Sequence, residues 1–465
     1  MEFSIDYLIA AIVIALFMGG VALFHSPETA RKGTWLLALG WALAVGVVLF
    51  RHPPSSPELL LIAILAGGAI GVSSGLRTGA VGVPAMIAFQ HGAGGLASFD
   101  IAYHELVRPG ADWTTLAESA AVLAIIFGAV TFTGSLVAAG KLARKIRQQP
   151  VFLPGHAAIL IGLLVLAALL SVFAVLQRGM PIGVSSATAL MVICLILGVI
   201  FTIRVGGADM PIVISFFNAT AGIAASFLGI VVGNYALIGG GAAVAASGSM
   251  LTIVMLRAIN RSLLAVFSGI RPSIAEATNP LEERVPLETG GMETLPFEQA
   301  IAALKRAKDV IIAPGYGMAL SEAQEQVHRL ENWLEERGAR VRYAIHPVAG
   351  RMPGHMNVVL AEVEVGYDKL FEMEAINDDF KQADLAIVIG ACDVVNPAAS
   401  TRQGTPISGM PILKVHEANT VIVLNYDEKP GFSGVENPLY EMKHVITVWG
   451  DAKANLNALF SSLQN

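Results

Sequence analysis

One ionisable side chain interrupts an apolar stretch of the chain. His91 lies in the segment AFQHGAGGLA (residues 88–97), where most other side chains are small or apolar. Ionisable groups inside a membrane cost free energy and commonly mark ion pathways. Because a histidine titrates near neutral pH, it can take up and release protons. His91 is therefore a candidate proton relay, and the alternative is a neutral imidazole that ties two helices together.

A second candidate site is the glycine-rich segment PGYGMAL (residues 314–320). Gly315 and Gly317 fit a tight turn that lets backbone N–H groups approach the pyrophosphate of a dinucleotide. The third position of the usual fingerprint is Leu320 instead of glycine or alanine. The motif therefore also fits a turn without a ligand.

The third candidate is Arg351, in the segment AIHPVAGR (residues 344–351). Folds that bind NAD usually place an acidic residue near the end of the second strand, whereas those that bind NADP use an arginine for the 2′-phosphate. This segment contains an arginine and no acid. It favours NADP over NAD, or else an unusual pose of the cofactor.

The elements around His91 are expected to be transmembrane helices. The chain has 465 residues, of which 54% are hydrophobic and 14% are charged. Crossing a bilayer takes about 20 apolar residues, and His91 lies near the middle of one such run, roughly 13 Å from either end. We predict nine spans, at residues 3–24, 33–50, 58–76, 83–102, 117–139, 153–176, 181–203, 209–232 and 235–256. Their clusters of small residues indicate close helix packing.

The distribution of basic residues predicts the orientation of these spans. The loops after the odd-numbered spans hold eleven Lys and Arg residues, and the other loops hold three. Basic loops stay on the cytoplasmic side. We therefore expect the N-terminus outside and everything after residue 257 inside, in a bacterial cytoplasmic membrane.

The elements around Gly315 and Arg351 are expected to form a soluble domain. Residues 272–465 carry a net charge of −11, against +5 for residues 1–271, which argues against nucleic acid as a partner. Short apolar segments alternate with helical or loop segments, as in a doubly wound, Rossmann-like parallel sheet. Six strands are predicted at residues 309–314, 340–347, 357–365, 385–390, 420–426 and 444–450, and a helix at 318–338.

The expected domain organisation has three parts. Residues 1–260 form the membrane domain, residues 261–300 a linker rich in proline, and residues 301–465 the nucleotide-binding domain. The chain's two cysteines, Cys194 and Cys392, suggest neither a disulfide framework nor a metal site.

Several long motifs resemble one known family. The segments APGYGMALSEAQ, HPVAGRMPGHMNVVLAE, INDDF, VIGACDVVNPAA, GMPILKV, GVENPL and GDAKA resemble the NADP(H)-binding domain of proton-translocating nicotinamide nucleotide transhydrogenase. The segment GADMPIVISFFNATAG resembles the membrane part of the same family's beta subunit. Together the matches run from about residue 80 to the end of the chain.

The resemblance implies a coupled, Si/Re-specific reaction: NADH + NADP⁺ + H⁺(out) ⇌ NAD⁺ + NADPH + H⁺(in). It implies that NADP(H) binds to this chain and that NAD(H) binds to a separate alpha-type subunit. It also implies a dimer of such assemblies.

The resemblance further implies roles for individual residues. His91 and Asn218 would face one water-accessible channel, with Asp209 at its cytoplasmic mouth. Asp393 would contribute to cofactor binding and to proton linkage, although an aspartate after a strand is also an ordinary helix cap. The residues expected to line the dinucleotide are Gly315, Tyr316, Gly317, Met318, Val348, Ala349, Gly350, Arg351, Met352, Gly390, Ala391, Asp393, Asn396, Asn425, Tyr426, Lys429, Gly431, Gly450, Asp451 and Ala452.

The sequence departs from the family after the fifth predicted strand. The family usually has a Lys-Arg-Ser run there that binds the 2′-phosphate, whereas this chain has Asn425, Tyr426 and Asp427. An aspartate would repel the phosphate, so either Lys429 or Arg351 must compensate, or the preference for NADP is weaker. The segment Gly431–Gly434 is expected to be a mobile lid.

Two other classes of protein remain as alternatives. A channel or transporter gated by a nucleotide-sensing domain would need a selectivity element such as a TVGYG filter or discontinuous helices, and neither is evident. A membrane-anchored NADP reductase would need only one or two spans and would have no use for an intramembrane histidine.

Overall fold

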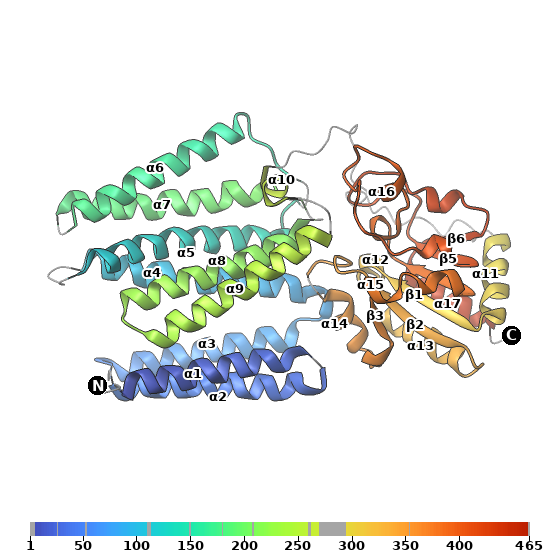
Figure 1. Cartoon of the computed structure of the whole chain (residues 1–465), viewed down its shortest axis with the longest axis horizontal. Helices are drawn as coiled ribbons and strands as arrows, with labels where there is room; N and C mark the ends of the chain where they lie inside the picture. Colours follow the sequence, from blue (N-terminus) through green and yellow to red (C-terminus); the bar gives the residue numbers. More distant parts are fainter. Residues whose placement is uncertain are drawn as a thin grey trace. The chain divides into compact units, whose positions relative to one another are not determined.

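The chain folds into two compact units (Figure 1). A computed structural model describes residues 5–25, 27–51, 54–108, 113–147, 150–178, 180–206, 209–258, 262–268, 294–352 and 354–463. One unit comprises residues 1–204 and 213–252, and the other comprises residues 205–212 and 253–465. We call them the helical unit and the sheet unit.

Long helices occur at all nine positions predicted for spans. Within the described residues they are α1 (Ile5–Ala22), α2 (Pro27–Arg51), α3 (Pro57–Arg77), α4 (Val83–Val107), α5 (Thr115–Leu142), α6 (His156–Leu176), α7 (Pro181–Ile203), α8 (Met210–Val231) and α9 (Tyr235–Ala258). Seven of them are long and apolar enough to cross a membrane. The described apolar part of α1, Leu8–Ala22, is shorter, and α4 is the more polar helix that carries His91, Asp100 and Glu105.

Glycines bring neighbouring helices into close contact, as predicted. A Cβ on Gly95 of α4 would lie 2.7 Å from the carbonyl oxygen of Gly128 on α5, and a Cβ on Gly128 would lie 2.8 Å from that of Gly95. In the same way, a Cβ on Gly222 of α8 would lie 2.4 Å from the backbone nitrogen of Ala245 on α9. Larger side chains would push these helices apart.

The described residues of the sheet unit form six parallel strands flanked by helices (Figure 1). The strands are β1 (Asp309–Pro314), β2 (Arg340–Ile345), β3 (Leu370–Glu372), β4 (Leu385–Ile389), β5 (Thr420–Asn425) and β6 (Val445–Trp449), in the spatial order β3-β2-β1-β4-β5-β6. The predicted doubly wound sheet is therefore confirmed. The helices are α11 (Thr294–Arg306), α12 (Tyr316–Leu320), α13 (Gln324–Glu335), α14 (His355–Ala361), α15 (Met373–Ile376), α16 (Ala398–Thr401) and α17 (Ala452–Leu463).

The third predicted strand, at residues 357–365, is wrong. Those residues contribute to α14, and β3 lies further along the chain at Leu370–Glu372. The reason is periodicity: Met356, Val359 and Leu360 are buried, at the i, i+3, i+4 spacing of one helix face. The apolar run therefore packs as a helix.

The helix predicted at residues 318–338 is interrupted. It forms α12 and α13, separated by a turn in which Glu322 has a positive φ of 52°. Most of the predicted linker, residues 261–300, lies outside the described residues. Its described parts form the short helix α10 (Leu263–Ser268) and the start of α11.

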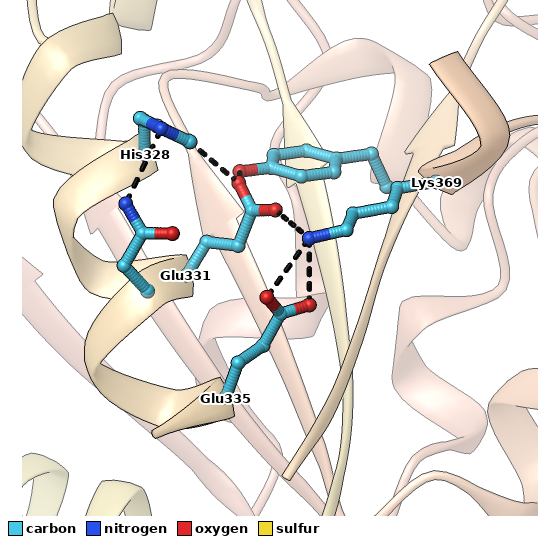
Figure 2. Close-up of polar contacts among 6 residues, drawn as sticks. His328, Glu331, Glu335 and Lys369 are labelled. Atoms are coloured by element: carbon cyan, nitrogen blue, oxygen red, sulfur yellow. Dashed lines mark hydrogen bonds and ion pairs between the residues drawn. The ribbon is translucent and has the colours of Figure 1, made fainter. Parts of the chain in front are cut away.

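A polar network joins α13 to the start of β3 (Figure 2). The Lys369 ammonium lies 2.5 Å from Glu331 and 2.7 Å from Glu335, and the Tyr343 hydroxyl donates a 2.8 Å hydrogen bond to Glu331. Glu331 is fully buried. Burial opposes its charge, but hydrogen bonds from Lys369, His328 and Tyr343 outweigh burial and hold the pKa of Glu331 below its usual value. The network thus keeps a buried carboxylate ionised.

We predict that Lys369→Met lowers the free energy of unfolding of the sheet unit by about 2–3 kcal/mol, because it leaves the buried Glu331 carboxylate without its cation. Calorimetry of the full chain in detergent measures the change. The control is Lys381→Met, because the Lys381 side chain is 58% exposed and its ammonium lies 3.9 Å from Glu417. Its effect should stay below about 1 kcal/mol. Equal losses in the two variants would contradict this account.

Candidate functional site

The candidate site lies at the carboxyl ends of the parallel strands. In the order β3-β2-β1-β4-β5-β6, chain direction across the sheet reverses between β1 and β4. Ligands of open α/β sheets bind in the crevice at such a point. The predicted nucleotide residues follow β1, β2, β4, β5 and β6, so they are brought to one edge.

Three glycines allow the β1 turn to contact the end of β4. A Cβ on Gly315 would lie 2.3 Å from the Gly390 carbonyl oxygen, and a Cβ on Gly390 would lie 2.1 Å from the Met318 nitrogen. The Gly317 N–H donates a 2.8 Å hydrogen bond to the Gly390 carbonyl. The predicted tight turn is present, but this N–H already has a protein acceptor. Close packing of two backbone segments therefore accounts for the glycine pattern.

The segment after β2 forms a fixed loop. The Val348 N–H donates to His346 Nδ1 over 3.2 Å, and the Arg351 N–H donates to His355 Nδ1 over 3.0 Å. Gly350 has a φ of 110°, and a Cβ there would lie 2.6 Å from His355. Two imidazoles thus hold the backbone that carries the predicted residues Val348, Ala349, Gly350, Arg351 and Met352.

The Arg351 guanidinium lies over two aromatic rings. Its Cζ lies 4.4 Å from the centre of the Tyr316 ring and 5.7 Å from that of Phe432. Arg351 is 3% exposed, and burial strengthens cation–π attraction. The contacts join loops that follow β1, β2 and β5.

Asp393 binds the segment Gly431–Gly434, which had been expected to be a lid. The Ser433 hydroxyl donates to Asp393 Oδ1 over 2.5 Å, and the Ser433 N–H donates to Asp393 Oδ2 over 3.0 Å. Cys392, rather than Asp393, occupies the N-cap position of the short 3₁₀ turn Asp393–Val395. The carboxylate therefore holds a neighbouring loop instead of capping this turn.

Asn396 and Asn425 have structural partners. Asn396 is fully buried; its amide donates to the carbonyls of Val435 and Glu436, and its oxygen accepts the Ala398 N–H. The Asn425 amide donates to the Ala391 carbonyl and to the Tyr440 hydroxyl. The Asn425 Oδ1 is buried and has no hydrogen-bond partner in the described part of the chain. Asn396 is therefore a structural tie, whereas Asn425 keeps one available acceptor.

The charged residues after β5 interact with each other. The Lys429 N–H donates to Asp427 Oδ1 over 3.1 Å, and its ammonium lies 3.8 Å from Asp427 Oδ2. Tyr426 and Lys429 are exposed. The lysine is thus already paired with Asp427.

The last predicted nucleotide residues, Gly450, Asp451 and Ala452, connect β6 to α17. The Ala454 N–H donates to Asp451 Oδ1 over 3.0 Å, which is an N-cap interaction at the start of α17. Gly450 has a φ of 130°, and Ala452 is buried. These residues lie at the end of β6, where Asp451 has a structural role in the helix.

In the helical unit, His91 is a partly buried residue of α4. Its Nδ1 is buried, and the ring makes no hydrogen bond to any other described residue. Ser135 on α5 also has a buried hydroxyl without a partner in the described segments, and a Cβ on Gly92 would lie 3.3 Å from the Ser135 Cβ. By contrast, His156 Nε2 contacts the Ile200 carbonyl over 3.0 Å. His156 is tied between helices, whereas His91 is not.

The other two predicted membrane residues lie on or next to α8. Asn218 is partly buried, and its side chain makes no hydrogen bond to His91 or to any other described residue. Asp209 is 7% exposed and immediately precedes α8. The role of either residue in a channel stays a prediction.

Comparisons with known proteins agree with the resemblance noted above. The NAD(P) transhydrogenase beta subunit family matches residues 4–462 of the chain. The chain belongs to the NAD(P) transhydrogenase beta subunit family. It is 38% identical over 460 residues to proteins named NAD(P) transhydrogenase subunit beta from Rhodospirillum rubrum and from a named strain of that species, with 96% of both chains covered.

Sequence reasoning missed three residues at the candidate site. Phe432 and Ser433 lie inside a segment that was treated only as a glycine-bounded lid, and their partners, Arg351 and Asp393, are far away in sequence. His346 stands directly before the predicted loop but gives no signal beyond its proximity to Arg351. Only the fold places these side chains together.

Burial fixes the protonation of two groups near the site. Burial lowers the pKa of His346 to about 4, although its contact with the Pro411 carbonyl favours the charged ring. A neutral ring suits the geometry, since Nδ1 accepts the Val348 N–H. Burial also raises the pKa of the Cys392 thiol to about 12, so Cys392 is not a thiolate at neutral pH.

We predict that the sheet unit loses up to about 3 kcal/mol of stability as the pH falls from 6.5 to 4, because of His346. In this range the unfolded ring binds a proton and the folded ring does not, so protons favour the unfolded state. Calorimetry at several pH values measures the loss, and His346→Gln should remove this component.

The control for His346 is His444→Gln. His444 also contacts a backbone carbonyl, that of His416, but is only partly buried. This variant should keep the pH dependence of the parent protein. If His346→Gln keeps it too, another group is responsible.

Proposed function

We propose that this chain binds NADP(H) at the carboxyl edge of its sheet and exchanges hydride with NAD(H) held on a partner alpha subunit. The observation that carries the proposal is the meeting of Tyr316, Arg351 and Phe432 beside the β1–β4 crevice. A buried cation at this edge suits a phosphate-bearing dinucleotide. The available acceptor of Asn425 and the carboxylate of Asp393 supply further polar groups.

The second nucleotide site requires another subunit. The described residues form one parallel sheet whose strand order reverses at one point, between β1 and β4, and such a point is where one nucleotide is expected to bind. Hydride transfer between two nicotinamides requires both rings at once, so NAD(H) is placed on an alpha-type subunit. Its relatives' name, subunit beta, supports such a partner. We further propose that two such assemblies form a dimer.

Arg351 is the proposed partner of the 2′-phosphate. Lys429 is exposed and paired with Asp427, so its charge is already offset. Arg351 is buried, and a guanidinium donates paired hydrogen bonds that match a phosphate. Of the two cations considered for this role, the buried Arg351 is therefore favoured over Lys429.

His91 is the proposed proton-carrying group of the membrane domain, residues 1–260, and Asn218 and Asp209 are placed on the same route. The absence of hydrogen bonds to the His91 ring among the described residues supports a relay over a structural tie. One proton moving through a total force of ~150 mV supplies about 3.5 kcal/mol. If protonation changes the affinity for NADP(H), the nucleotide changes the affinity for the proton equally.

The proposed location is the bacterial cytoplasmic membrane. Eleven basic residues in one set of loops against three in the other support an outside N-terminus and a cytoplasmic sheet unit. Seven helices in the described part of the chain are long and apolar enough to cross a membrane, and they support a multi-pass protein.

We predict that His91→Asn reduces proton-coupled transhydrogenation about 100-fold or more, because asparagine cannot carry the proton. The assay uses liposomes that contain this chain with its alpha subunit, and it records NADPH formation together with proton uptake. The control is His104→Asn, an exposed histidine on the same helix, which should retain both activities. Coupled turnover in His91→Asn equal to that of the parent would refute the relay. Nucleotide-gated ion flux without hydride exchange would instead favour a channel.

We predict that Arg351→Gln weakens NADP(H) binding about 10- to 100-fold and leaves NAD(H) binding to this chain unchanged, because it removes charge-assisted hydrogen bonds to the 2′-phosphate. Titration calorimetry with each nucleotide on the full chain measures both affinities. Lys429→Gln tests the other cation and should change NADP(H) affinity less than about threefold. The reverse ranking would transfer the role to Lys429.

A further inference from the structure

Ser433 connects its loop to Asp393 through both of its polar groups. The hydroxyl donates to Asp393 Oδ1 over 2.5 Å, and the backbone N–H donates to Asp393 Oδ2 over 3.0 Å. The same hydroxyl oxygen accepts the Val435 N–H over 3.1 Å. Because a hydroxyl has a single proton, accepting from Val435 and donating to Asp393 fixes its direction.

The rest of the segment Gly431–Gly434, which we call the strap, is shaped around this interaction. The Gly434 N–H donates to the Gly431 carbonyl over 3.1 Å and closes a tight turn. A Cβ on Gly431 would lie 2.9 Å from Asp393 Oδ2, so a larger residue there would crowd the carboxylate. The turn thus rests directly on Asp393.

Phe432 connects the strap to the opposite side of the crevice. Its ring lies 5.7 Å from the Arg351 Cζ, and that guanidinium lies 4.4 Å from the Tyr316 ring. Asp393 follows β4, Arg351 follows β2 and Tyr316 follows β1. Two adjacent strap residues therefore contact groups from both sides of the β1–β4 crevice.

We propose that Ser433 is a positioning residue that holds the strap closed over the nucleotide crevice and sets how fast the nucleotide leaves. The inference rests on the proposed NADP(H) site. A dinucleotide that enters or leaves at the β1–β4 crevice must displace the strap, and displacement breaks both Ser433 hydrogen bonds to Asp393. Ser433 itself needs no contact with the nucleotide.

The test compares Ser433→Ala, Ser433→Thr and Ser461→Ala in the full chain. Stopped-flow fluorescence measures NADPH release into excess NADP⁺, and hydrogen exchange measures protection of residues 431–435 without nucleotide. Alanine keeps the N–H contact but loses a hydrogen bond to a charged acceptor, so release should be about tenfold faster or more. Exchange of the strap should rise as well. Threonine keeps a hydroxyl and should restore slow release, and Ser461→Ala in α17 should match the parent.

Two results would overturn the proposal. One is unchanged release and unchanged strap exchange in Ser433→Ala. The other is equally fast release in the alanine and threonine variants, since that would show that any change at this position loosens the loop. If the parent chain binds no NADP(H), the proposed function fails, and strap exchange in Ser433→Ala by itself then decides whether the interaction holds the loop.

Discussion

The close approach of two backbone segments at the point where the sheet reverses direction determines the rest of the candidate site. Gly315, Gly317 and Gly390 leave no room for a Cβ between the β1 turn and the end of β4. This contact fixes the backbone positions of Tyr316, which follows β1, and of Asp393, which follows β4. A larger residue at any of the three positions would separate the two loops. The strap could then no longer contact Asp393 and Arg351 at the same time.

Burial affects which ionisable side chains carry a charge at the carboxyl edge of the sheet. His346 is buried and neutral, so it can accept a backbone N–H and fix the loop that carries Arg351. The Arg351 guanidinium lies over two aromatic rings, which attract a cation. After β5, the partly buried Asp427 lies 3.8 Å from the ammonium of the exposed Lys429 and offsets its charge.

In the helical unit, buried polar side chains differ in whether they have a hydrogen-bond partner. Among its described residues, Thr131 and Thr220 form a 2.7 Å hydrogen bond between α5 and α8. His156 has a carbonyl partner, whereas His91 lacks one among the described residues. A polar atom buried without a partner is costly and therefore points to function.

Within the described residues, the sequence by itself determined the positions of the nine long helices and of five of the six strands, because hydrophobic period and glycine spacing are local properties of the chain. It predicted a strand at residues 357–365, because a short apolar run fits a strand as well as a helix. In the structure these residues contribute to α14, which buries one helical face. Only the tertiary structure decided that Gly317 donates to Gly390, that Ser433 binds Asp393 and that Arg351 stacks on Phe432. Each of these contacts joins residues about 40 or more positions apart, and such pairs leave no periodic signal in the sequence.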